Sequence, residues 1–142
     1  MRFLSRCWKA FVEFFRKKPT MLPIFDPRPS DQLSRFLTQS NHFRRTDNTV
    51  THKAFMPPLD LKLSVFQTRD LDEPVVWALG EGGSRNLYGR ATITVSAVSD
   101  TGLTLDPDND PPRHANITGW PQKSEQKLLA LKLAEKATLQ LR

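Results

Sequence analysis

Histidine is the residue type in this chain that is best suited to acid–base chemistry near neutral pH. The 142 residues contain three, His42, His52 and His114, and an unperturbed imidazole has a pKa of about 6.5. His114 has the most suitable surroundings, because it follows an acidic stretch and precedes Asn116 by two residues, on the same face of an expected strand. We favour a structural role, in which His114 bonds to backbone or to a loop carboxylate.

A two-histidine phosphodiesterase would also place histidines in separate halves of the chain. Such enzymes carry a hydroxyl residue two positions after each histidine, whereas this chain has Ala54 and Asn116 at those positions. The sequence therefore assigns no catalytic residue, and the three histidines remain candidates. What stays open as an alternative is a small enzyme, or a nucleotide- or anion-binding protein, that uses His114, His52 and the neighbouring arginines in one cleft.

Those arginines lie in the segment His42-Phe43-Arg44-Arg45, which joins an aromatic ring to two guanidinium groups. Guanidinium groups bind phosphate and stack on aromatic rings, so Arg44 and Arg45 are a candidate anion-binding site. Arg35 and His52 are close to them in the sequence. A solvated loop that packs Phe43 inward explains the same residues and is the interpretation we favour.

An acidic stretch at residues 106–110 has part of the pattern of a calcium-binding loop. Asp106, Asp108 and Asp110 have the spacing of its first three ligands. Pro111 then stands where the loop needs glycine, and Ile117 where it needs a bidentate glutamate. A solvated acidic turn explains the carboxylates better, and we expect no metal site.

Cofactor binding is not indicated elsewhere. The glycine-rich residues 80–85 lack the Lys-Ser/Thr ending of a nucleotide-binding loop. The single cysteine, Cys7, has no histidine near it in the sequence that would activate it as a nucleophile. One cysteine also allows no disulfide within the chain, so a reducing cytoplasm is the expected location.

Positive charge is concentrated at the N-terminus. The chain has 21 Lys+Arg and 15 Asp+Glu, a net charge of +6, and residues 1–20 hold six of the bases but one acid. The remaining residues are therefore close to neutral, which argues against a basic nucleic-acid-binding domain. Binding of nucleic acid through the basic arm alone remains a second alternative.

Residues 1–18 have the periodicity of an amphipathic helix. Its apolar stripe is rich in aromatic residues, and we expect it to lie at an interface with a partner protein or with an anionic membrane surface. The expected interface residues are Phe3, Leu4, Trp8, Phe11 and Phe15. Residues 19–29 are rich in proline and predict an extended linker.

Residues 30–142 predict a single α+β domain, with a small mixed or antiparallel sheet covered by helices. We expect helices at 30–39, 70–80 and 124–141, and strands at 61–68, 87–98, 103–105 and 113–120. The strand at 103–105 should form a hairpin with the one before it. The expected core contains Ile93, Val95, Leu103, Trp120, Leu129 and Leu133.

Four short elements within residues 54–117 resemble a family of small bacterial proteins of no known activity. They are Ala-Phe-x-Pro at 54–57, Leu-Ser-Val at 63–65, Gly-Leu at 102–103 with a following Asp-Pro, and His-Ala-x-Ile at 114–117. The resemblance implies a bacterial origin and a shared fold, and it transfers no catalytic residue. The sequence as a whole favours a non-enzymatic protein-interaction module, cytoplasmic or peripheral to a membrane, whose N-terminal helix docks on its partner.

Overall fold

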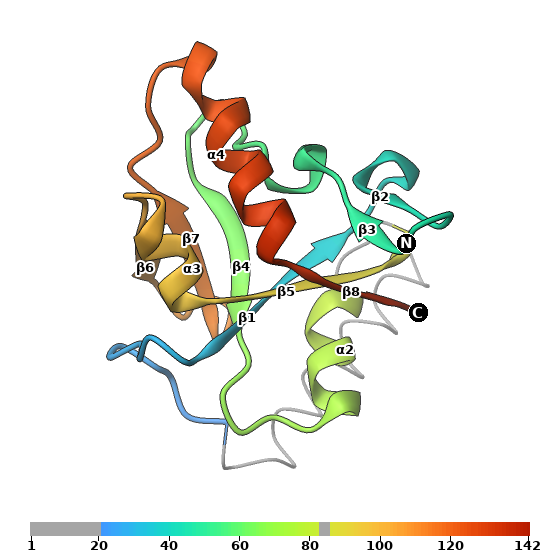
Figure 1. Ribbon diagram of the computed structural model, residues 1–142. Helices are drawn as coiled ribbons and strands as arrows, with labels where there is room; N and C mark the ends of the chain where they lie inside the picture. The colour runs from blue at the N-terminus through green and yellow to red at the C-terminus, as the bar shows by residue number, and fades with distance from the viewer. Residues whose placement is uncertain (1–20, 83–85) are drawn as a thin grey trace.

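The computed structural model describes residues 21–82 and 86–142, and a six-stranded antiparallel sheet is its centre (Figure 1). The strand order is β6-β7-β4-β1-β5-β8. The strands are β1 (Gln32–Leu37), β4 (Leu63–Gln67), β5 (Gly89–Thr94), β6 (Thr104–Pro107), β7 (His114–Thr118) and β8 (Thr138–Leu141). A separate two-stranded ribbon pairs β2 (Phe43–Arg44) with β3 (Thr49–Val50).

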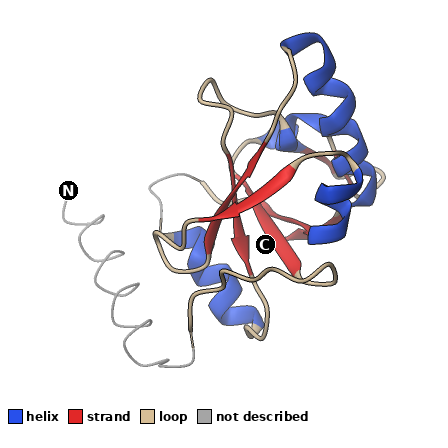
Figure 2. Ribbon diagram, turned by 90° about the vertical axis from the view of Figure 1, so that its left-hand side faces the viewer, coloured by secondary structure: helices blue, strands red, loops and turns tan. Residues whose placement is uncertain are grey.

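Helices lie on both sides of the six-stranded sheet (Figure 2). The α-helices are α2 (Glu73–Glu81), α3 (Val95–Asp100) and α4 (Lys123–Lys136), and the short 3-10 helices are η1 (Ser40–His42) and η2 (His52–Phe55). Helix α4 packs against η2 and covers one face, whereas α2 lies against the other face beside β5. Among the described residues, no helix has the length and apolar character needed to cross a membrane.

The core fills the space between α4 and the sheet. Successive side chains of a strand point to opposite faces, so every second residue of β1, β4, β5 and β7 enters it. Ile93, Val95, Leu103, Trp120 and Leu133 are all buried there, as expected. Leu129 is half-buried at the margin of the same cluster. The α+β class with an antiparallel sheet is thus confirmed.

The expected helix at residues 30–39 is wrong, because this segment forms β1 in the middle of the sheet. Leu33, Phe36 and Leu37 have helical spacing, but Leu33 and Leu37 also lie four apart on one strand face, and both are fully buried. All six residues of β1 pair with β5. Sheet pairing with distant strands has overridden a weak local preference.

The expected strand at residues 87–98 ends early, and this changes the predicted hairpin. Strand β5 stops at Thr94, whose hydroxyl accepts a hydrogen bond from the Ala97 amide and so caps α3. The turn that follows returns the chain to β6, which pairs with β7 and not with β5. The alternation of apolar residues predicted a strand as far as Ala97. Val95 and Ala97 are indeed buried, but they belong to helix α3 and not to β5.

The expected C-terminal helix is too long by five residues. Helix α4 ends at Lys136, and residues 138–141 form β8 at the edge of the sheet beside β5. Leu139 is buried by this pairing. In contrast, the expected elements at 61–68, 70–80 and 113–120 appear as β4, α2 and β7.

The described part of the proline-rich segment packs on the domain. Ile24 is buried, and its backbone N–H and C=O both bond to the Asn109 side chain, at 3.1 and 2.9 Å. The buried Arg113 donates from Nε to the carbonyl of Leu22. The predicted N-terminal helix and its interface residues lie outside the described residues.

Candidate functional site

The structure separates the histidines into two groups. His42 and His52 belong to η1 and η2, which lie on the α4 side of the sheet. His114 is on β7, and its side chain shares the opposite sheet face with Phe66 of β4. His52 and Arg44 line one cleft, and His114 is not among the residues that line it. The single cleft that would combine His114, His52 and Arg44 is therefore not formed.

His114 lies at the centre of a hydrogen-bonded chain. Its Nδ1 is 2.7 Å from Oδ1 of Asp108, and its Nε2 is 2.6 Å from Oγ of Ser64. Asn116 donates to the second oxygen of Asp108 at 3.1 Å. The bond to Asp108 is the loop carboxylate contact that the sequence favoured.

The loop between β6 and β7 positions Asp108. The Asn109 amide donates to the carbonyl of His114 at 2.8 Å, and the Asp110 amide reaches Oδ1 of Asp108 at 3.3 Å. Burial alone would raise the pKa of Asp108, but the hydrogen bonds from His114, Asp110 and Asn116 outweigh it and lower this pKa. Asp108 is therefore a carboxylate at neutral pH. No group of three or more His, Cys, Asp or Glu side chains in the described residues is placed to hold a metal ion.

Ser64 is a member of this chain that the sequence did not single out. It lies on β4, whose register with β7 pairs Ser64 with Asn116 and Phe66 with His114. Ser64 and His114 are thus diagonal neighbours on one sheet face. Only this register brings them together, and fifty positions separate them in the sequence, so a local pattern had no signal for the contact.

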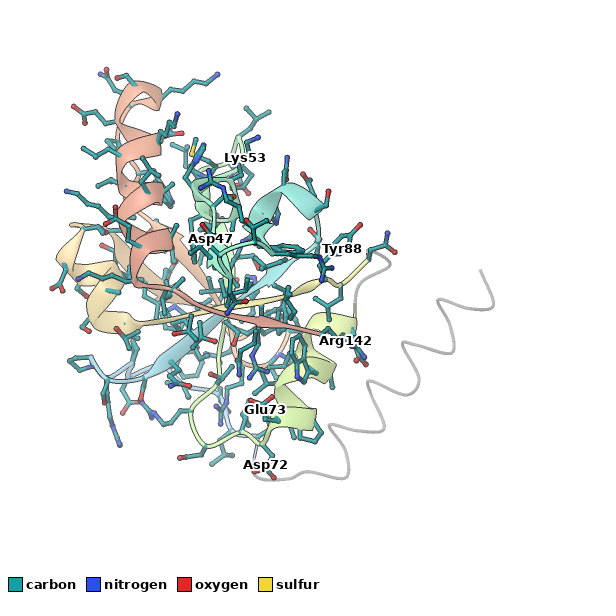
Figure 3. The ribbon with its side chains drawn as sticks, turned by 45° about the vertical axis from the view of Figure 1, so that its right-hand side comes forward. Asp47, Lys53, Asp72, Glu73, Tyr88 and Arg142 are labelled. Atoms are coloured by element: carbon teal, nitrogen blue, oxygen red, sulfur yellow. The ribbon has the colours of Figure 1, made fainter. Side chains whose placement is uncertain are left out.

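A basic cleft of about 510 Å³ opens on the other side, between β1, the start of β4 and the two 3-10 helices. Its cationic lining residues are Arg35, Lys53 and Lys62, and Met56 and Pro58 add apolar surface. No carboxylate is among the described residues that line it. Figure 3 shows Lys53 far from Asp72 and Glu73, the acidic residues at the start of α2.

Arg35 builds the floor of the basic cleft. Strands β1 and β4 pair only at Leu33 with Gln67 and at Ser34 with Phe66, and beyond these positions no pairing joins them. Arg35 bridges the opening, donating from Nε to the carbonyl of Ala54 at 2.8 Å and from Nη1 to that of Ser64 at 3.0 Å. These two carbonyl oxygens fix the orientation of the guanidinium.

His42 lines the same cleft and is only 6% exposed. Its Nδ1 is buried and has no hydrogen-bond partner in the described part of the chain. Burial, and then the nearby charge of Arg35, lower the pKa of His42, so the ring is neutral at pH 7. A buried polar atom without a hydrogen-bond partner lowers the stability of the folded protein. Such an atom therefore points to a role in function or to a bound water or ion.

The predicted anion site at Arg44 and Arg45 is divided. Arg44 lines the second cleft, of about 360 Å³, together with His52 and Glu135. Burial, followed by the charges of Lys127, Lys53 and Arg44, lowers the pKa of His52. Arg45 instead lies over the ring of Phe43, 5.4 Å from its centroid. Phe43 is buried, as expected, but Phe43 and Arg44 form strand β2 and not a loop. The Glu135 carboxylate makes this cleft less suited to anions than the basic cleft.

No family model, curated protein or solved structure matches this chain. The resemblance to small bacterial proteins therefore stays a prediction, and the function rests on the residues described above.

Proposed function

We propose that this protein is an interaction module, and that it binds a phosphorylated or strongly acidic segment of a partner protein in the basic cleft. The observation that carries this proposal is the lining of the cleft, whose described residues include the cations Arg35, Lys53 and Lys62 and no carboxylate. The proposal develops the anion-binding alternative but moves it from Arg44 and Arg45 to these three cations.

The three cations suit an anion in different ways. The guanidinium of Arg35 is held in place by two carbonyl oxygens, so it supplies a fixed positive charge at the floor of the cleft. Lys53 and Lys62 are exposed at the rim, and each ammonium group can turn its donors toward an incoming oxyanion. Charge-assisted hydrogen bonds of this kind are about twice as strong as neutral ones.

The apolar residues beside the cleft favour a peptide over a small free anion. Leu59 is fully exposed and Leu61 is 40% exposed, and both adjoin Lys62 in the loop before β4. Met56 and Pro58 add to the same surface from inside the cleft. An isolated phosphate would leave this apolar surface in water, whereas a segment with an anionic and an apolar side chain would cover both.

The direct test is fluorescence polarisation with a dye-labelled, degenerate peptide pool that holds a phosphoserine flanked by leucines. The Lys53→Gln/Lys62→Gln double variant should bind at least ~10-fold more weakly, equivalent to about 1.4 kcal/mol. The Lys123→Gln/Lys132→Gln variant makes the same change of charge on α4, outside the cleft, and should bind as the unaltered protein does.

Two results would contradict the proposal. One is equal loss of binding in the two double variants, which would indicate a general effect of net charge. The other is equal binding of the unphosphorylated pool. Binding of inorganic phosphate as tight as that of the peptide would instead favour a small-ligand protein, the alternative that the sequence left open.

The N-terminal arm adds a second contact to this proposal. Its role rests on the sequence, in which residues 1–18 are basic and rich in aromatic side chains. We propose that the arm docks on the same partner, or on an anionic membrane surface of the cytoplasm. Co-sedimentation with phosphatidylserine vesicles at low and high salt distinguishes the two: salt-sensitive sedimentation that deletion of residues 1–20 abolishes supports the membrane.

A further inference from the structure

The sheet face away from α4 is divided into two halves. Helix α2 covers the half formed by β1 and β5, where Arg90 stacks on the Trp77 ring at 4.6 Å and Phe36 lies against Gly80. The half formed by β4, β7 and β6 carries Ser64 and His114. The side chains of His114 and Asp108 are 14% and 40% exposed, so water reaches this second half.

The chemistry of the Asp108, His114 and Ser64 groups fixes where the protons lie. Asp108 is a carboxylate and can only accept, so the hydrogen between it and His114 must be on Nδ1. In the neutral form of the ring, Nε2 carries the lone pair and can accept the hydrogen of the Ser64 hydroxyl. The hydroxyl therefore points its proton at a base that is itself oriented by an anion.

We propose that Ser64 is a nucleophile for acyl transfer, that His114 is its general base, and that Asp108 positions His114. Both contacts, at 2.6 and 2.7 Å, lie within the reach that such a relay requires. Ser64 also lines the basic cleft, where its carbonyl accepts from Arg35. Its hydroxyl bonds to His114 instead, and neither His114 nor Asp108 lines that cleft, so the activity would be separate from anion binding.

The reaction would use an ester and water. As Oγ of Ser64 bonds to the acyl carbon, its proton passes to Nε2 of His114, and the ester C–O bond then breaks as this proton moves to the leaving alcohol. Water next attacks the acyl-serine and gives a proton to Nε2. The bond from the acyl carbon to Oγ breaks, Oγ recovers the proton, and a carboxylic acid leaves.

The surroundings of the relay hold its members in place. The Phe66 ring meets the imidazole edge-on, with centroids 5.4 Å apart and planes at 77°. Asn116 and the Asp110 amide fix the carboxylate of Asp108. This support restricts the imidazole and the carboxylate to the orientation that proton transfer needs.

The test is covalent labelling of the full chain with a dye-linked fluorophosphonate, which reacts with activated serines. We expect one label per chain. Trypsin cleaves after Lys62 and Arg69 and releases residues 63–69, in which Ser64 is the only serine, so the mass of this peptide identifies the site without any variant. No label, or a label on another peptide, would overturn the proposal.

Variants then test the roles. His114→Gln should slow labelling at least ~100-fold, whereas Ser96→Ala, which removes a hydroxyl bonded to Thr94 instead, should not slow it. Asp108→Asn should also slow it, and nitrogen NMR should show the proton of the His114 ring moving from Nδ1 to Nε2, because an amide can donate to Nδ1. Unchanged labelling in either His114→Gln or Asp108→Asn would show that the chain of hydrogen bonds is structural only.

Discussion

Arg35 donates from Nε to the carbonyl oxygen of Ala54 at 2.8 Å, and this bond joins the central strand β1 to η2. The same guanidinium reaches the carbonyl of Ser64 on β4 at 3.0 Å. One side chain thus holds three elements around the basic cleft and supplies part of its charge. A substitution of Arg35 should therefore affect both the stability of the fold and the binding of anions in the basic cleft.

Arg35→Met should lower the free energy of unfolding by about 2 to 3 kcal/mol, because two carbonyl groups lose a charged donor. Arg35→Lys keeps the charge but lacks the planar fork that reaches both carbonyls, so its loss should be smaller. Urea denaturation of both variants measures the difference. A loss within about 0.5 kcal/mol for Arg35→Met would show that the carbonyls find other partners.

Leu133 and Leu128 provide a matched pair on α4. Leu133 is fully buried and Leu128 is 55% exposed. Leu133→Ala should cost about 2 to 5 kcal/mol through lost burial and the cavity left behind, whereas Leu128→Ala should cost within about 0.5 kcal/mol. Thermal melting of both proteins tests the assignment of the buried face, and equal melting temperatures would contradict it.

The sequence predicted the elements whose pattern is local. The alternation around Val65, the start of α2 near Pro74 and the extended residues around Ala115 all lead to the observed β4, α2 and β7. Strands β1 and β8 were mistaken for helix because their residues, such as Leu37 and Leu139, are compatible with either structure. Both become strands by pairing with β5, and the partner strand is far away in the sequence.

In the candidate sites, too, local contacts could be predicted from the sequence and long-range contacts could not. The contact between His114 and Asp108 spans six positions, and it is one of the two kinds of bond, to backbone or to a loop carboxylate, that the sequence led us to expect for His114. The contact with Ser64 depends on the register of β4 and β7, and the basic cleft depends on the divergence of β1 from β4, so neither had a local signal. No feature of the sequence singled out His42, and it is the burial of its Nδ1 without a partner among the described residues that distinguishes it.

Gly80 is the point at which α2 approaches β1. A Cβ at this position would lie 2.6 Å from Cε1 of Phe36, which is closer than real atoms approach. Alanine is more favourable than glycine in a helix interior by about 1 kcal/mol. The clash with Phe36 should outweigh this gain, so Gly80→Ala should lower the free energy of unfolding by about 1 to 2 kcal/mol. In a Phe36→Leu background the penalty should disappear. Denaturant melts of the four proteins of this cycle provide the measurement.

Asp31 and Arg69 form an ion pair that predicts a pH dependence. Arg69 donates from Nε to both carboxylate oxygens, at 3.0 and 2.9 Å, and these bonds lower the pKa of Asp31. A lowered pKa means that the unfolded chain binds the proton more readily. The stabilisation is therefore fully present above pH ~4, the ordinary range for this residue, and is lost as the pH falls through the lower folded value.

Asp31→Asn should accordingly destabilise the protein at pH 7, and the difference from the unaltered protein should shrink as the pH falls below ~4. Denaturation at a series of pH values measures this. In an Arg69→Gln background the effect of Asp31→Asn should lose most of its pH dependence, because only the backbone N–H and the charge of Arg28 then still lower the pKa of Asp31. An undiminished dependence there would show that Arg69 is not responsible.

The most direct test of the basic cleft is an NMR titration of the His42 imidazole with and without inorganic pyrophosphate. Burial and the charge of Arg35 lower the pKa of His42 in the free protein, and an anion bound beside it would stabilise the charged ring. We predict that pyrophosphate raises the pKa of His42 and shifts the signals of Lys53 and Lys62, while Lys123 and Lys132 on α4 stay unchanged. An unchanged pKa of His42, with equal shifts at all four lysines, would contradict an anion site in this cleft.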